Sequence, residues 1–221
     1  MEITSAARDM KRTVVIENVA PAVDCGRYPV KREVGATFEV SADIFKEGHD
    51  ALLAFLKFRR FDATAWRETP MSFVDNDRWA GRFVLDENTR YVFTIEAMTD
   101  AFRSWLADLV KRDDAGQDAA SELLEGQALI RATAERAAGK DGAALRSFAD
   151  RIAKAAKQAG AVAVARDPAL AALMDRHADR ADATWCEHQF EVVVDRERAR
   201  FAAWYEFFPR SGATPERHAT F

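Results

Sequence analysis

The chain has 221 residues, of which 48% are hydrophobic and 31% are charged, and this composition is that of a globular chain and excludes a wholly disordered one. Its formal net charge is −4 and its lysines and arginines are scattered, which argues against a nucleic-acid partner. It contains no apolar run of the roughly 18 to 20 residues that a membrane span needs and no apolar signal core after Met1, so we expect a cytoplasmic protein with no membrane partner.

Apolar and polar side chains alternate through the first part of the chain, up to about Met98. The alternation predicts strands over 37–43, 52–58, 79–85 and 91–97, because successive side chains of a strand point to opposite faces. Glycine, proline and asparagine-aspartate clusters separate these runs, as turns between short antiparallel strands require. The first part is therefore predicted to be an all-β sandwich.

Helical spacing replaces the alternation from Asp100 to about Arg180. In the first helix, Asp100 is placed to cap the start and an apolar stripe repeats every three to four residues. The predicted helices are one over 100–112, one beginning near Asp118, one from Asp141 to a stop at Gly160, and one opening with Asp167 as cap and Pro168 at its first position. Three or four amphipathic helices imply a small bundle.

Alternation returns after Trp185. One run places Phe190, Val192 and Val194 on one side, and a second run does the same with Phe201, Ala203, Tyr205 and Phe207. A ribbon of two strands alone is marginal in water. We therefore expect both runs to join the first sheets.

The changes of period give the domain organisation. We expect an α+β chain of several parts, in which a bundle is inserted into a sandwich. The predicted parts are a flexible N-terminus over 1–11, the sandwich over 12–99 and 186–208, the inserted bundle over 100–185, and the start of a linker over 209–221.

Residues that could carry chemistry are sparse. Cys25 and Cys186 fit a reducing compartment as free thiols, and a disulfide between them is the less favoured alternative. Cys186, Glu187 and His188, with His177, are the nearest approach to a metal cluster, but they lack the paired short spacings of a zinc site. Because no phosphate loop, GxSxG or HExxH motif occurs, we predict no catalytic residue, no cofactor and no metal.

Two groups of apolar residues suggest binding. Trp66 lies in a segment that alternates poorly, so an edge position with an exposed indole could serve as a platform for a sugar ring, although packing is the more favoured role. On the second helix, Leu123, Leu124 and Ile130 could supply apolar surface for self-association, with a bundle core as the more favoured use.

An ordered series of short motifs extends from Arg12 to Ser211. It includes Val14-Val15-Ile16-Glu17-Asn18-Val19, Gly48-His49-Asp50, Asn76-Asp77-Arg78-Trp79, Leu123-Leu124-Glu125-Gly126 and Trp204-Tyr205-Glu206-Phe207-Phe208-Pro209-Arg210-Ser211. The series resembles the amino-terminal region of maltose-1-phosphate maltosyltransferases, which extend α-1,4-glucans and belong to glycoside hydrolase family 13. Cys25 departs from the resemblance, since a small residue is expected there.

The resemblance implies an immunoglobulin-like sandwich with a helical insert that takes part in a homodimer. It also implies a following (β/α)8 barrel whose two carboxylates transfer maltosyl units from maltose 1-phosphate to a glucan with retention. None of the barrel motifs is present, so no catalytic position is carried over. We therefore expect a non-catalytic fragment that contributes to assembly and to one wall of a substrate cleft.

Two other functions stay open at this point. The first is a glucan-binding module that acts through exposed aromatic side chains such as Trp66. The second is a stand-alone enzyme of unknown type, which the lack of a catalytic motif disfavours.

Overall fold

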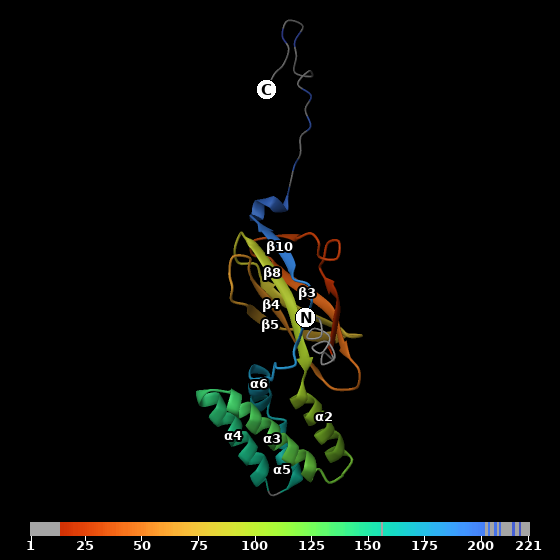
Figure 1. Cartoon of the computed structure of the whole chain (residues 1–221), viewed down its shortest axis with the longest axis vertical. Coiled ribbons are helices and arrows are strands. Elements are labelled where there is room, and N and C mark those ends of the chain that lie inside the picture. The colour runs from red at the N-terminus through yellow and green to blue at the C-terminus, as the bar shows by residue number, and fades with distance from the viewer. Residues whose placement is uncertain are drawn as a thin grey trace, which may run out of the picture.

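The structure, a computed structural model, describes residues 14–155, 157–201, 203, 206, 208, 214 and 217. Two β-sheets lie face to face, and a group of helices lies beyond one end of them (Figure 1). The expectations for residues 1–11, and for most of 209–221, lie outside the described residues.

The smaller sheet has four antiparallel strands. Their order is β1 (Val14–Ala20), β3 (Thr37–Lys46), β7 (Arg78–Val84) and β6 (Ser72–Asp75). In β3 the alternation is complete, because Phe38, Val40, Ala42 and Ile44 are buried while the residues between them face outward. The sequence prediction for this strand is therefore confirmed.

The larger sheet has six strands. Five of them follow the order β2 (Val30–Glu33), β10 (Phe190–Asp195), β8 (Arg90–Thr99), β4 (Leu52–Arg60) and β5 (Arg67–Pro70), and β9 (Thr184–Trp185) also pairs with β8. All pairs are antiparallel except β10 with β2. The predicted architecture of mostly antiparallel sheets with inserted helices is confirmed at this level.

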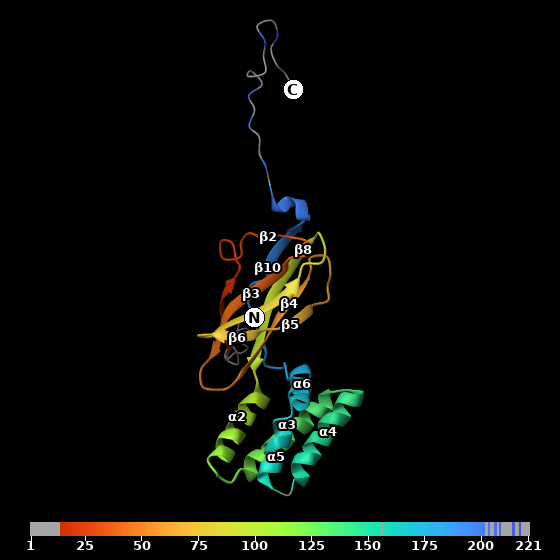
Figure 2. The same ribbon diagram turned by 180° about the vertical axis from the view of Figure 1, so that it is seen from behind.

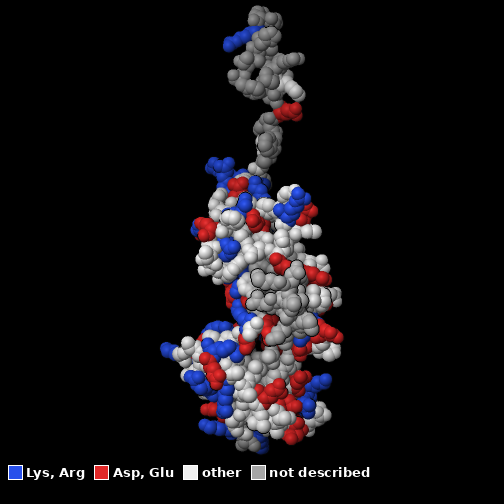
Figure 3. Space-filling model, in the orientation of Figure 1, with Lys and Arg blue, Asp and Glu red and all other residues white. Residues whose placement is uncertain are grey.

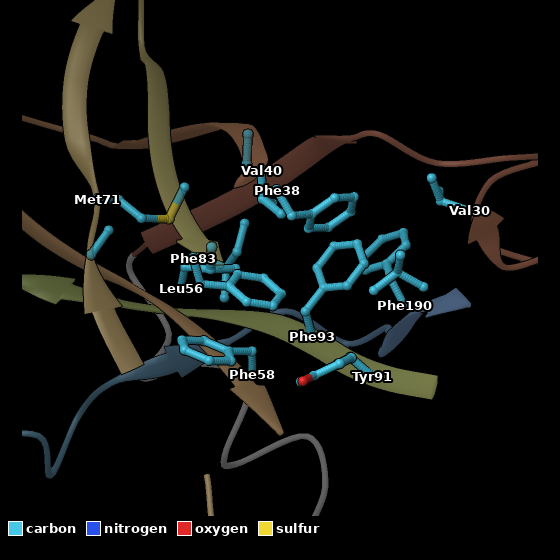
Figure 4. Close-up of a cluster of buried hydrophobic side chains, with 14 of the residues drawn as sticks. Val30, Phe38, Val40, Leu56, Phe58, Met71, Phe83, Tyr91, Phe93 and Phe190 are labelled. Carbon is cyan, nitrogen blue, oxygen red and sulfur yellow. The ribbon is translucent and has the colours of Figure 1, made fainter. Parts of the chain in front are cut away.

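Aromatic side chains fill the space between the two sheets (Figure 4). The Phe38 ring contacts those of Phe83 and Phe93 edge to face, with ring centroids 5.5 and 5.2 Å apart, a geometry that aromatic pairs favour. At the start of β8 the buried Tyr91 hydroxyl donates a hydrogen bond to the Asp86 carboxylate. Burial and this carboxylate together raise the pKa of Tyr91 to about 12.

Between β8 and β9, the described residues of the insert form five helices (Figure 2). They are α2 (Ala101–Asp114), α3 (Ala120–Arg136), α4 (Gly139–Lys154), α5 (Gln158–Ala165) and α6 (Pro168–Arg176). The two predicted caps are confirmed, since Asp100 accepts from the Arg103 backbone N–H and Asp167 from that of Ala169. No helix in the described part of the chain combines the length and hydropathy needed to cross a bilayer.

One predicted helix was wrong in its extent. The sequence predicts a single helix from Asp141 to Gly160, but α4 ends at Lys154, and Gly160 lies inside α5. The cause is a long-range contact at the start of α5. The Gln158 side-chain amide donates to the Asp113 carboxylate at 2.8 Å and its oxygen accepts from the Ala119 backbone N–H at 3.1 Å.

The second strand predicted after the bundle is also wrong in the residues that can be checked. Phe201, Ala203 and Phe208 lie in no strand and are exposed, and a short 3-10 helix, η1 (Glu197–Arg200), precedes them. Tyr205 and Phe207 lie outside the described residues. Both edges of β10 are already paired, one with β8 and the other with β2, so the segment that follows finds no free edge on β10 itself.

Candidate functional site

Two tryptophans meet on the outer face of the larger sheet. Trp66 precedes β5 and Trp185 lies in β9, and their ring centroids are 6.0 Å apart at an interplanar angle of 61°. The Arg59 guanidinium lies 4.8 Å from the centre of the Trp66 ring, and the Lys57 ammonium 5.2 Å from that of Trp185. Both contacts fall within the range of cation–π attraction.

Next to these rings lies a set of four charged side chains, Lys57, Glu68, Glu96 and Arg180, which we name the outer-face charge cluster. The Arg180 guanidinium donates to both oxygens of Glu68 at 2.8 Å and to Glu96 at 2.7 Å. From the other side Lys57 contacts Glu68 at 2.6 Å and Glu96 at 3.3 Å. Lys57 and Glu96 are buried, so these charges are paired within the fold as buried charges must be.

The Glu68 carboxylate of this cluster is not arranged for acid catalysis. A retaining glycosidase needs one carboxylic acid whose pKa is raised, so that it can donate a proton near neutral pH. Hydrogen bonds from Arg180 and then Lys57 lower the pKa of Glu68 to about 2. Glu68 is therefore ionised at neutral pH, and its geometry is that of a structural ion pair.

Trp66 is half-buried at the edge strand, with one ring face next to Arg59 and Trp185 against it. The sequence identified Trp66 but missed the rest of its surroundings. One signal was available. Lys57 is a charged residue between Leu56 and Phe58, in a stretch of β4 that is otherwise apolar from Leu52 to Phe58, which indicates a buried ion pair on the second face.

The three leucine and isoleucine residues considered for an interface have different surroundings. Ile130 is fully buried in the bundle core, so its side chain is not available to a second copy. Leu123 is partly buried and packs against the same core. Leu124 is 66% exposed. Of the three, Leu124 therefore offers the largest surface for association.

A polar groove of about 700 Å³ lies beside α2 and α3. Asp50, Thr99 and Ser104 line its end near the sandwich, and Glu125 lies at its other end on α3. The Trp105 indole forms part of the wall and donates a hydrogen bond to the Glu122 carbonyl at 2.6 Å. Basic and acidic side chains lie side by side over the face of the molecule seen in Figure 3, without a large patch of one sign.

The cysteines and histidines that the structure describes do not form a metal-binding group. Cys25 is exposed, Cys186 is half-buried, both are free, and burial raises the pKa of the Cys186 thiol. His188 lies 3.2 Å from the Gly26 carbonyl, and His177 lies 2.8 Å from the Asp141 carboxylate in the bundle. Within the described ranges, no group of three histidine, cysteine, aspartate or glutamate side chains could hold a metal ion.

Comparison with known proteins identifies the family. Residues 12–196 match the family model of "Alpha-1,4-glucan:maltose-1-phosphate maltosyltransferase, domain N/S". The chain is similar to maltosyltransferases of that name from three organisms. The identity is 46% for Myxococcus xanthus, 37% for Chlorobaculum tepidum and 39% for Rhodospirillum rubrum. The matches cover 95%, 96% and 94% of this chain and 33%, 32% and 32% of the respective relative. The chain thus spans about a third of the length of these curated relatives. It belongs to the domain N/S family of α-1,4-glucan:maltose-1-phosphate maltosyltransferases.

Proposed function

We propose that this chain is the non-catalytic amino-terminal part of a maltosyltransferase that extends α-1,4-glucans from maltose 1-phosphate. Its relatives carry that activity in their names, and the chain matches about a third of their length. The free cysteines are consistent with a cytoplasmic location. In this proposal the chain contributes to homodimer assembly and to one wall of a substrate cleft.

The observation that carries the assembly role is the exposed Leu124 on α3. This apolar side chain is 66% exposed, so it can contact a second copy. Glu125 and the polar groove lie beside Leu124. Leu124 with these polar neighbours matches the apolar centre and polar rim of a protein interface. In a twofold dimer the same patch is used by both subunits.

Sedimentation velocity over a range of concentrations tests this role. We expect the 221-residue chain to form a dimer, L124D to shift the equilibrium towards monomer, and the control V84D to leave it unchanged. Val84 is 52% exposed and lies on the smaller sheet, away from α3. A chain that stays monomeric at every concentration, or a dimer that L124D does not weaken, would contradict the assembly role.

The proposal that this chain does not catalyse maltosyl transfer is tested by a separate assay. We expect no transfer of maltosyl units from maltose 1-phosphate to a maltooligosaccharide by the purified chain. Measurable turnover that survives repurification would overturn the non-catalytic proposal.

We also infer that the sandwich is immunoglobulin-like. The order β1-β3-β7-β6 corresponds to the A-B-E-D sheet of that fold, and β10-β8-β4-β5 corresponds to G-F-C-C′. Tyr91 lies near the start of the strand that corresponds to F, as the tyrosine of that fold does, although its buried hydroxyl donates to the Asp86 carboxylate five positions upstream and not to the backbone. An experimental structure with a different strand order would contradict it.

A second candidate function is glucan binding through Trp66 and Trp185. Their rings, at 6.0 Å, present aromatic surface of the kind on which sugar rings stack, beside the charged hydrogen-bonding groups of Arg59 and Glu68. Titration with maltohexaose, followed by tryptophan fluorescence, tests it. We expect W66A to abolish the response and the control W79A, on the smaller sheet, to keep it. No response of the unmodified chain at millimolar ligand would exclude this function.

A further inference from the structure

The helical insert meets the sandwich through a narrow joint. The chain crosses once at residues 99–100, between β8 and α2, and once at residues 177–183, between α6 and β9. Figures 1 and 2 both place the bundle beyond one end of the sheets. The orientation of the insert therefore depends on what these two crossings contact and on the hydrogen bond of 2.8 Å from the Ala51 backbone N–H to the Ser104 hydroxyl of α2.

The apolar part of the joint is small. Leu53, Phe55 and Met98 on the outer face of the larger sheet pack against Ala178 and Ala183 from the second crossing. The alanines bring only methyl groups to this contact, and burial of so little surface stabilises an arrangement weakly.

Open space lies on both sides of the joint. A cavity of about 50 Å³ is lined by Leu53, Phe102 and Met174. The polar groove of about 700 Å³ reaches from Asp50 and Thr99 along α2. Because close packing resists movement and voids do not, the apolar contacts alone leave the insert room to tilt.

Arg180 joins the second crossing to the larger sheet through polar contacts. Its guanidinium binds Glu68 of β5 with two parallel hydrogen bonds, binds Glu96 of β8 with a third, and lies 4.3 Å from the centre of the Phe55 ring on β4. One side chain of the crossing thus contacts three strands. Bidentate arginine–carboxylate pairs fix geometry as well as supplying attraction.

We propose that Arg180 is a positioning residue that fixes the helical insert at one angle to the sandwich, and that without it the insert pivots about residues 99–100. The remaining cation, Lys57, would then face two carboxylates, and the buried Glu96 would lose a hydrogen bond. Such an unbalanced charge draws in water and separates the crossing from the sheet. A partner that binds the insert would then encounter it in a range of orientations relative to the sandwich, and not in a single one.

Spin-label distances between the two parts test this proposal. Labels are placed at T37C on β3 and S147C on α4, both exposed positions, in a C25S/C186A background. We expect a single narrow distance distribution in the unmodified joint and a broad one in R180A. R180K keeps the charge without the bidentate pair, so we expect it to broaden the distribution less.

The matched control is R176A. Arg176 is an exposed arginine on α6 that pairs with Asp141 inside the bundle at 2.8 Å, so its loss leaves the joint intact. Far-ultraviolet circular dichroism verifies that each variant is folded. If R180A fails to fold, R180K decides the question. A distribution in the folded Arg180 variants as narrow as that of R176A overturns the proposal.

Discussion

The sandwich and the helical insert fill their interiors in opposite ways. In the sandwich, large rings from both sheets meet, as Phe93 of the larger sheet does with Phe38 of the smaller one. In the insert, one large ring, Trp105, lies against a glycine, because a Cβ at Gly126 would come within 1.9 Å of the indole. The sandwich core therefore depends on large side chains that fill it. The insert depends on a position without a side chain, Gly126, which leaves room for the Trp105 ring. The two parts should differ in which substitutions damage them.

The largest effect is expected from loss of volume in the sandwich. Phe93 has no exposed surface, and F93A leaves a cavity among aromatic rings, so we expect a loss of about 3–5 kcal/mol in the free energy of unfolding. Urea denaturation followed by circular dichroism measures it. The control V84A, at a 52% exposed position, should change stability by at most about 0.5 kcal/mol. Equal losses in the two variants would contradict the aromatic core.

Added volume should damage the insert next. In G126A the new methyl group overlaps the Trp105 ring, which is buried and held by its hydrogen bond to the Glu122 carbonyl, so we expect a loss of about 1–3 kcal/mol. G160A is the matched control in α5, where the nearest atom, Ala155 Cβ, would be 3.8 Å away. It should stabilise the helix by about 1 kcal/mol. If G126A and G160A change stability in the same direction, the proposed lack of space at Gly126 is wrong.

Adding a methyl group to a glycine of the sandwich should lower the free energy of unfolding less than it does in the insert. At Gly81 in β7 a Cβ would lie 2.9 Å from Met71 Cγ and 3.1 Å from Leu56 Cβ. Methionine is flexible and can move aside, so we expect G81A to lower stability by about 1 kcal/mol or less. A thermal denaturation midpoint below that of G126A would show that the sandwich is the less tolerant part.

The smallest effect is expected from protonation of the outer-face charge cluster. Arg180 and Lys57 lower the pKa of Glu68 from 4.5 to about 2 in the folded chain. Between these values the unfolded chain binds more protons, so the contribution of Glu68 is full above pH 4.5 and is lost as the pH falls towards 2. Urea midpoints of the unmodified chain and E68Q should therefore converge over this range. A constant difference down to pH 2 would contradict the pKa shift.

The sequence contained much of the fold but little of the candidate site. Alternation in residues 37–43 and capping by Asp100 and Asp167 are local features, and each leads to the observed element. The break between α4 and α5 has no such signal, because it depends on Gln158 reaching Asp113 and Ala119 from a distant part of the chain.

Strand register limits prediction of the site in the same way. Trp66 and Trp185 are far apart in sequence and meet only because β5, β4, β8 and β9 lie side by side in one sheet. The outer-face charge cluster likewise combines residues from two strands, an edge strand and a crossing. Side-chain spacing along one segment carries no information on which segment will be its neighbour.

The pairing of Ala97 with Thr184 places the two ends of the insert on adjacent strands of one ladder. In topological terms, the bundle replaces the turn of a β-hairpin, whose simplest form needs only two residues. We therefore expect insertions and deletions within the helices to leave the register of β8 and β9 unchanged. The bundle can vary in length and surface over evolution independently of the sheets, as a hairpin loop that has acquired its own core.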